Sequence, residues 1–424
     1  MPPELEFTEA EKVFEALESG RLDRLFTAAN TDYYERDGFE SLRFGVGVPR
    51  ESVWRLISAI RHSTGLLVLE SAWGDFQVRV SPTAQLMEAL YRIDTAPARS
   101  AFRKTDLPPD ERWIMRDRQL AEEAVLIGID KTSVGTPSAA HIAQVRAEVI
   151  AALYDDVNPI SEAATIATRF YGAMRSLPRK GPDRLSPEFI MGIHSLLCED
   201  DPDAGVLRTT DLLLDQSAPV PPTSASRIVA ELEAMEAYAE SQDVPFVHPL
   251  IKTLGLAWWI RRVGPFDRYN YLVSRLASMA LALRYGYRVR GILDSGRRLE
   301  EDAENEGDLT RLFIHQLTII ARSNQVGEEE LTHRVQRYQE VTDRFRRLDI
   351  NHRQALILDR AFHTPDTAFT IKHHARTRGL GYETARQDFI RLVESGYLEP
   401  QKRGKAFEFR LTADAGKRLA KQPG

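Results

Sequence analysis

The residues best suited to chemistry lie at 264–275, where the chain reads GPFDRYNYLVSR. Asp267, Asn270 and Arg275 supply an acid, an amide and a permanent cation beside strongly apolar sequence. Backbone N–H groups ahead of a helix can bind phosphate when glycines let the ligand approach. However, Gly264 has no group that could act as a general base, and no histidine stands close by in the sequence. The segment therefore poses a choice between an enzyme, a former enzyme and a helix without catalytic chemistry.

Two apolar helices are expected to position this segment. They cover HPLIKTLGLAWWIRRV and PFDRYNYLVSRLASMALALRYG, and their apolar character places them at the centre of a helical bundle. Pro265 suits the first position of a helix, and apolar side chains continue at helical spacing from Phe266 to Ala280. We therefore predict one helix over 264–283, with no open anion-binding loop.

The sequence before these helices carries a second set of signals. Ser186 suits an N-cap and Pro187 the first helical position, which predicts a helix over 185–200. Gly205, Arg208 and Thr209 follow it, and then the step PVPP. Over roughly 120–320 this order resembles the Fic (Fido) proteins, which typically transfer AMP from ATP to a protein hydroxyl. In that family, such a helix precedes a G-x-x-R-T element and a proline-rich step follows the target-binding flap.

The resemblance extends to the active loop of the family, H-P-F-x-[DE]-G-N-[GK]-R-x-x-R, but the chemistry is eroded. The retained positions are Pro265, Phe266, Asn270 and Arg275, with Asp267 at the variable position. The departures are Gly264 for the histidine base, Arg268 for the acidic magnesium ligand, Tyr269 and Tyr271 for the glycines, and Leu272 for the first arginine. Glycine cannot take a proton, arginine repels magnesium, and two tyrosines obstruct approach to the backbone.

The autoinhibitory segment of the family, often SSxIEG, corresponds to EAVLIGIDKT at 123–132. Ile129 and Asp130 are retained, whereas Ile127 and Gly128 stand where serines are usual. An inhibitor that occupies a phosphate site has no purpose when ATP is not bound. The joint erosion of both motifs favours a scaffold without catalytic residues, without cofactor and without a metal site.

The last segment differs in charge from the rest of the chain. Residues 351–424 hold 14 Lys and Arg against 8 Asp and Glu, a balance of 14 − 8 = +6, in a chain of net charge −6. Its pattern of three helices and a basic hairpin resembles the winged helices often appended to Fic proteins. The resemblance implies DNA contacts from the second helix of the pair and from the wing. The candidates are Tyr382, Thr384, Arg386, Gln387, Arg391, Lys402, Arg403 and Lys405.

Composition excludes several classes of protein. With one cysteine, Cys198, the chain can form neither an internal disulfide frame nor a cysteine-based zinc site. The acidic N-terminus lacks the pattern of a signal peptide, and no apolar run reaches the ~20 residues of a membrane span. These features predict a cytoplasmic protein without membrane contact.

We expect a mainly α protein with four parts. They are an N-terminal α(+β) region of unassigned role at 1–110, a degenerate Fic helical domain at 111–325, a linker helix at 326–348 and a winged helix-turn-helix domain at 349–424. The expected function is DNA-binding transcriptional regulation, with the bundle serving dimerisation or the sensing of an unknown effector. The alternatives are a divergent adenylyltransferase that uses ATP and magnesium, and a protein-interaction scaffold.

Overall fold

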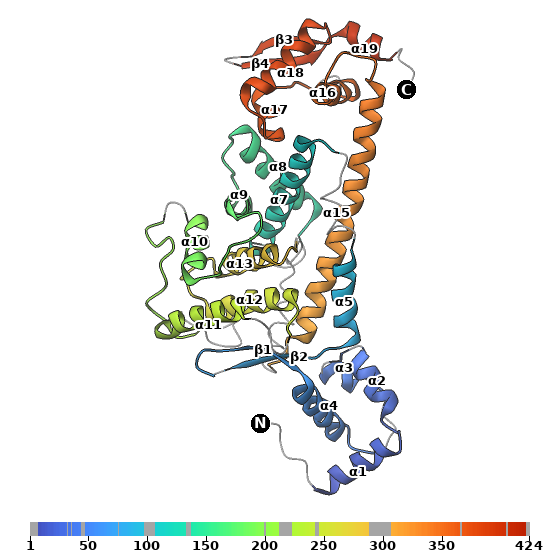
Figure 1. Ribbon diagram of the computed structural model, residues 1–424, viewed down its shortest axis with the longest axis vertical. Coiled ribbons are helices and arrows are strands. Elements are labelled where there is room, and N and C mark those ends of the chain that lie inside the picture. Colours follow the sequence, from blue (N-terminus) through green and yellow to red (C-terminus); the bar gives the residue numbers. More distant parts are fainter. Residues whose placement is uncertain are drawn as a thin grey trace. The chain divides into compact units, whose positions relative to one another are not determined.

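The computed structural model of the chain separates into two compact units, built from residues 1–99 and 176–324 and from residues 100–175 and 325–424 (Figure 1). We call them the first and the second unit. The structure describes residues 7–31, 33–34, 36–43, 47–74, 76–96, 107–132, 137–198, 201–211, 223–241, 246–287, 307–364, 367–403 and 406–420. Helices dominate both units, as the sequence predicts.

The first unit begins with four helices, a hairpin and a fifth helix. These are α1 (Phe7–Glu18), α2 (Asp23–Thr31), α3 (Arg36–Glu40), α4 (Arg50–Thr64), β1 (Leu66–Glu70), β2 (Gln77–Val80) and α5 (Ala84–Thr95). The alternating residues of GLLVLES and DFQVRVSP form the two strands as expected. They pair antiparallel from Leu66 opposite Val80 to Glu70 opposite Gln77, with an irregularity between Leu67 and Leu69.

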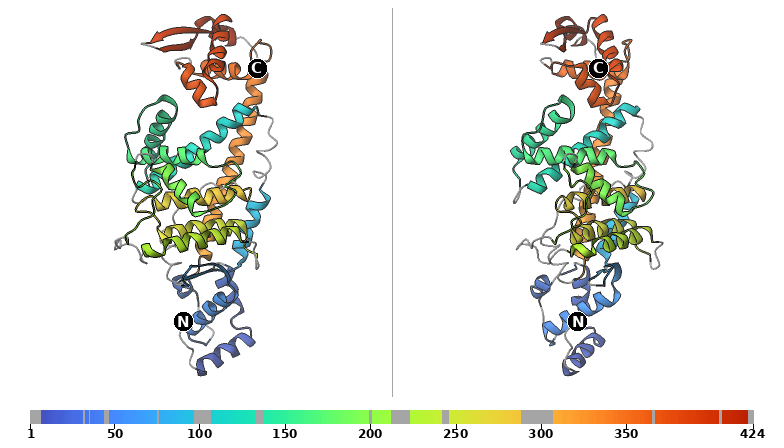
Figure 2. Two further views of the ribbon diagram at one scale, coloured as in Figure 1. Left: turned by 60° about the vertical axis from the view of Figure 1, so that its left-hand side comes forward. Right: turned by 90° about the vertical axis from the view of Figure 1, so that its left-hand side faces the viewer.

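The remaining helices of the first unit form its centre. They are α10 (Pro187–Leu197), the 3-10 turn η1 (Ala225–Arg227), α11 (Ile228–Glu240), α12 (Pro249–Val263) and α13 (Asn270–Arg284), with the first part of α15 (Thr310–Arg344). Helices α12 and α13 run side by side in each view (Figures 1 and 2). Most of their side chains are buried, including Trp259, Leu276 and Ala280. Burial around the whole helix explains why both sequences are apolar on every face.

The second unit contains α7 (Pro109–Thr132), α8 (Ala139–Asp155), most of α9 (Glu162–Ser176) and the later part of α15. Gly128 lies where α7 crosses α9, because a Cβ there would stand 2.1 Å from the carbonyl oxygen of Ala163. This close approach explains why position 128 requires glycine. Helix α15 is continuous for 35 residues, so the expected linker helix is the second half of a longer helix.

The chain ends in a small module, residues 352–420, which we call the C-terminal module. It consists of α16 (His352–His363), α17 (Ile371–Arg378), α18 (Tyr382–Glu394), β3 (Leu398–Arg403), β4 (Ala406–Leu411) and α19 (Ala413–Ala420). Phe389 of α18 stacks on Phe409 of β4 at 4.7 Å between ring centroids, and this pair anchors a core shared with α16. Phe369 adds a bridge to the hairpin, since it exchanges two backbone hydrogen bonds with Phe409.

Two further observations concern the described residues only. None of their helices combines the length and the apolar character that a membrane span requires. Nor do they contain three or more His, Cys, Asp or Glu side chains grouped so that they could hold a metal ion.

Candidate functional sites

The segment 264–270 forms a loop, so the prediction of one helix over 264–283 was wrong. Helix α12 ends at Val263, and Gly264 takes a left-handed conformation (φ 55°) while its N–H still donates to Ile260 at 2.9 Å. Helix α13 begins only at Asn270. Pro265 therefore follows a C-cap glycine, a position where proline is common because it cannot continue the helix. The apolar residues of this loop are spaced as in a helix, although the loop itself is not helical.

Asn270 holds the 264–270 loop closed on itself. Its Oδ1 accepts the Phe266 N–H at 2.9 Å and its Nδ2 donates to the Phe266 carbonyl oxygen at 2.6 Å. These two hydrogen bonds satisfy the backbone N–H and carbonyl groups of Phe266, which a helix would otherwise pair. Tyr269 precedes it with φ 63°, where a bulky side chain is a genuine outlier. The residue that replaces a family glycine thus keeps a conformation that glycine adopts more easily.

Arg208 connects this loop by hydrogen bonds to an earlier segment of the chain. Its buried guanidinium donates to the carbonyl oxygens of Gly264 at 2.6 Å and Val263 at 3.1 Å, and its own N–H donates to Pro265 at 3.1 Å. It also donates to the carbonyl oxygens of Thr210 and Thr223. Burial lowers the pKa of Arg208, and the carbonyl oxygens compensate for the lost water. The G-x-x-R-T arginine here serves to shape the loop.

His194 is the residue near the loop that the sequence did not reveal. Its ring lies parallel to that of Phe266, with centroids 4.0 Å apart and 1° between the planes. Nδ1 accepts the Gly205 N–H at 2.9 Å, and Nε2 faces the Sγ of Cys198 at 3.4 Å. Burial lowers the pKa of His194, so the ring is neutral at pH 7. With both nitrogens engaged inside the core, it does not replace the missing base at Gly264.

The position of the family's acidic magnesium ligand is occupied by an ion pair. The guanidinium of Arg268 pairs with the carboxylate of Asp201, which is largely buried. A cation at this position and a neutralised carboxylate beside it do not fit a Mg²⁺ ion, which prefers free oxygen ligands.

Arg275, the last retained motif residue, is only 3% exposed. Its single hydrogen bond to the described residues runs from Nη2 to the Tyr271 hydroxyl at 3.3 Å, and its Nε is buried without a partner. The Tyr271 ring lies 5.1 Å from the Arg275 guanidinium and 5.5 Å from that of Arg261. Leu272 is buried in the core, as a leucine in place of arginine requires. The charge of Asp267 partly offsets the lowering of the pKa of His194 and of Arg208 by burial.

The predicted DNA-contacting residues of α18 share one exposed face. Its opposite face is buried through Ala385, Phe389 and Leu392, together with a buried carboxylate, Asp388. The exposed side chains are Tyr382, Thr384, Arg386, Gln387 and Arg391. Lys402 is exposed on β3, whereas the side chain of Arg403 and the whole of Lys405 lie outside the described residues.

A carboxylate that the sequence did not single out organises this face. Glu383 Oε1 accepts hydrogen bonds from Arg386 Nη1 and Gln387 Nε2, both at 2.9 Å. Hydrogen bonds from Gln387 and Arg386 lower the pKa of Glu383, so it is ionised at pH 7. The two candidate base-reading side chains are therefore held together on one turn of the helix.

Asp388 anchors α18 from its buried side. Arg353 donates to both of its oxygens, at 2.7 and 3.0 Å, and Asn351 donates at 3.0 Å. Burial alone would raise the pKa of Asp388, but hydrogen bonds from His374, Arg353 and Asn351 outweigh it and the pKa is lowered. The exposed face of α18 is thus fixed relative to α16 by a buried ionic network.

In fold, the chain is similar to solved structures of Fic family proteins. One from Desulfovibrio desulfuricans G20 shares 15% identity, covers 78% of this chain and 97% of its own, and gives a TM-score of 0.45. A fragment of Fic-1 from C. elegans shares 16%, with 74% and 86% covered and a TM-score of 0.48. A Fic domain containing signaling protein from Bacteroides thetaiotaomicron VPI-5482 shares 12%, with 70% and 99% covered and a TM-score of 0.40. No family model and no curated protein matches the sequence.

Proposed function

We propose that this chain is a Fic-fold protein that has lost AMP transfer and acts as a DNA-binding transcriptional regulator. The observation that carries the proposal is the face of α18, where Tyr382, Thr384, Arg386, Gln387 and Arg391 are all exposed above a buried apolar face. Arginine and glutamine are the side chains that pair with guanine and adenine in the major groove. A rigid helix that presents both is suited to read a DNA sequence.

The order of elements in the C-terminal module supports a winged helix. Helices α16, α17 and α18 precede the hairpin β3–β4, and Phe369 joins the hairpin from between α16 and α17. In such modules the second helix of the helix-turn-helix pair enters the major groove, here α18, and the first crosses the backbone. The hairpin then forms the wing, with Lys402 beside the backbone phosphates.

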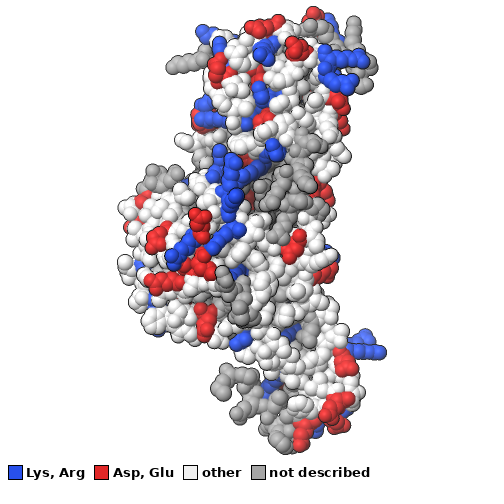
Figure 3. Space-filling view, in the orientation of Figure 1, with Lys and Arg blue, Asp and Glu red and all other residues white. Residues whose placement is uncertain are grey.

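Charge on the module is mixed on the face seen in Figure 3, where Lys and Arg lie among Asp and Glu. Specific binding therefore rests on the alignment of α18 with base edges more than on a uniform basic surface. Helix-turn-helix dimers bind two half-sites that lie about one helical turn apart. We accordingly propose a homodimer as the binding species.

AMP transfer is the second candidate, because the 264–270 loop persists in spite of its substitutions. Asn270 and Arg208 maintain its path, and Tyr269 retains a left-handed backbone. Against transfer stand the absence of a base at Gly264 and the pairing of Arg268 with Asp201. A chain with no affinity for DNA or nucleotide would instead be a protein-interaction scaffold.

The experiment that tests the proposal is selection of genomic DNA fragments by the full-length protein. We expect one enriched sequence, and Arg386→Ala or Gln387→Ala should lose about 1–3 kcal/mol of binding at particular base pairs only. A matched control is Arg55→Ala, which removes an arginine of α4 that pairs with Glu51. The proposal is contradicted if neither the wild type nor the variants enrich any sequence.

A further inference from the structure

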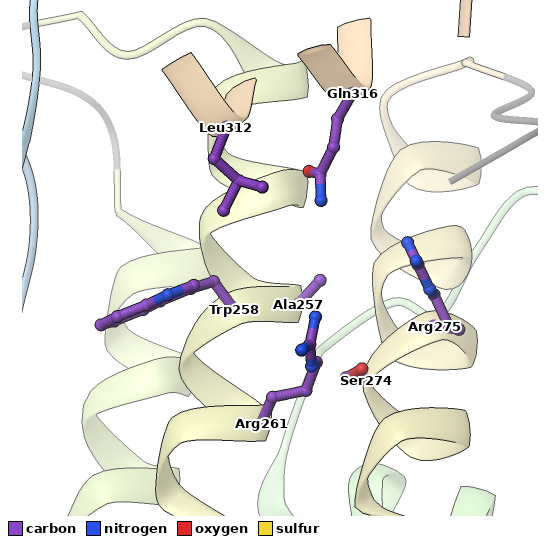
Figure 4. Close-up of a pocket in the computed structure, with 7 residues that line it drawn as sticks. All are labelled: Ala257, Trp258, Arg261, Ser274, Arg275, Leu312 and Gln316. Carbon is purple, nitrogen blue, oxygen red and sulfur yellow. The ribbon is translucent and has the colours of Figure 1, made fainter. Parts of the chain in front are cut away.

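A small cavity lies between α12, α13 and the first part of α15, on the side of α13 that carries Arg275. Its lining consists of Ala257, Trp258, Arg261, Ser274, Arg275, Leu312 and Gln316. Figure 4 shows the Arg261 and Arg275 guanidinium groups and the Gln316 amide pointing toward the space between the three helices. Among the described residues, the lining thus contains two permanent cations and no carboxylate.

Arg275 requires a counter-charge that the described residues do not provide. Its guanidinium is buried and has Tyr271 as its one hydrogen-bond partner among the described residues. A buried charge is normally paired, because its lost hydration is otherwise uncompensated. A phenol hydroxyl and an aromatic ring reduce this cost without neutralising the charge. Arg275 lines the cavity, and its Nε is buried without a hydrogen-bond partner among the described residues.

We propose that this cavity binds a single monovalent anion of halide size, with chloride as its occupant in solution. The size follows from the volume of about 10 Å³ over which the centre of a water molecule can move, which is room for one water. A chloride ion fits such a space, whereas a tetrahedral oxyanion requires the side chains of Arg261 and Gln316 to move apart. The anion would accept hydrogen bonds from Arg275, Arg261 and the amide of Gln316.

The test is the unfolding temperature of the full chain when sodium chloride or bromide replaces sodium gluconate at constant ionic strength. A ligand that binds only the native state stabilises it in proportion to the logarithm of its concentration. We expect a rise of about 2–4 °C for each tenfold increase in halide above the dissociation constant. Arg275→Met should remove this dependence and should be at least as stable as the wild type in gluconate.

Arg284→Met is the matched control, because Arg284 is also on α13 but has a carboxylate partner, Glu240, with Nη2 at 2.6 Å from Oε2. It should lose stability at every halide concentration and keep the wild-type dependence. Crystals grown in bromide should show an anomalous peak between Arg261 and Arg275. A water in that place, equal stability in halide and gluconate, or stabilisation by sulfate or phosphate alone each overturns the proposal.

A second inference rests on the proposed DNA binding and on a different set of contacts, within the second unit. Three side chains of α17 pair with the carboxyl end of α8. Lys372 and Arg376 both pair with Asp156, and His373 Nδ1 lies 2.8 Å from Asp155 Oδ1. The three side chains lie on the helix that crosses the DNA backbone in a helix-turn-helix pair, and Lys372 and Arg376 are cations.

The same helix is held at its other end. Arg378 Nη1 donates to Glu111 Oε1 at 2.6 Å, and Glu111 is 2% exposed. His352, at the start of α16, lies 3.0 Å from Asp110 Oδ1. Carboxylates at the start of α7 and at the end of α8 thus pair with basic side chains of α16 and α17.

We infer that Asp155 and Asp156 form an autoinhibitory latch that competes with DNA phosphates for Lys372, His373 and Arg376. In this proposal, the three side chains leave the carboxylates when they contact a duplex. An effector or a partner that frees the end of α8 would then increase DNA affinity. The latch gives the helical part of the second unit a means to regulate the C-terminal module.

The test compares DNA binding of the wild type with Asp155→Asn/Asp156→Asn in the full chain over a range of salt. Each cation released onto a phosphate adds about 0.9 to the magnitude of the log–log salt slope. We expect tighter binding for the variant and a slope steeper by about two. The control, Asp23→Asn/Asp203→Asn, makes the same change of net charge in the first unit and should leave the slope unchanged.

The outcomes separate the latch from the proposed function. If the wild type binds DNA and the latch variant has the same affinity and slope, the latch is refuted while DNA binding stands. An equal gain in affinity for both double variants also refutes the latch, because net charge then explains it. If neither wild type nor latch variant binds DNA at any salt concentration, both proposals fail.

Discussion

Replacement of Arg208 by methionine should release the 264–270 loop. Methionine retains most of the apolar stem but removes every donor to the carbonyl oxygens of Val263 and Gly264. A hydrogen bond to a charged group contributes about 1.5–3 kcal/mol, and these two are fully buried, so their gross loss is about 3–6 kcal/mol. Because the variant no longer buries a charge, we expect a net loss near the lower end, about 3 kcal/mol of unfolding free energy.

The assay combines urea unfolding with amide hydrogen exchange. Exchange should accelerate at the Gly264 and Arg208 N–H groups, which donate to Ile260 and Pro265. Arg208→Lys should be intermediate, because one ammonium group cannot reach all the carbonyl oxygens that the guanidinium serves. A loss below about 1 kcal/mol together with unchanged exchange at both amides would refute the view that Arg208 shapes the loop.

Three further predictions address the loop and the C-terminal module. Tyr269→Gly should be more stable than Tyr269→Ala in thermal unfolding, because both lose the ring but only glycine tolerates φ 63° without strain; equal stability contradicts the strain. Asp388→Asn should cost about 3 kcal/mol, since it removes the buried carboxylate to which the half-buried Arg353 donates. The folded-state pKa of Asp388 is lowered, so its contribution is present at neutral pH and is lost as pH falls below about 4; the variant should lack this dependence in acid titrations of stability. Neither the wild type nor Gly264→His should transfer label from α-labelled ATP to protein, since Arg268 also displaces the metal; label incorporation that depends on Arg275 contradicts this.

Local signals in the sequence were sufficient to predict the elements that depend only on neighbouring residues. Ser186 caps α10 by accepting the Phe189 N–H at 3.3 Å, and the alternating segments form β1 and β2. The division of α18 into a buried and an exposed face also follows from its 3.6-residue period. In each case, neighbours within one or two turns determine the outcome.

The path of the 264–270 loop could not be read in the same way, because its determinants are distant in sequence. Arg208 reaches Gly264 across 56 positions, and His194 stacks on Phe266 from another helix. Phe266, Tyr269 and the later apolar residues do recur at helical spacing, but the first two lie in the loop before α13 begins. The ion pairs of α17 with Asp155 and Asp156 were hidden for the same reason, since only the fold brings these segments together.

The salt dependence of duplex binding by the full-length protein tests the central claim most directly. With a selected genomic sequence, the logarithm of the association constant should fall steeply and linearly with the logarithm of the salt concentration. Lys402→Ala should reduce the magnitude of that slope by about one, with a similar loss of affinity for selected and unrelated sequences. Two results would contradict the proposal that the C-terminal module is a DNA-binding domain. The first is that the protein does not bind duplex DNA at low salt. The second is that Lys402→Ala leaves the slope unchanged and the protein binds all sequences with equal affinity.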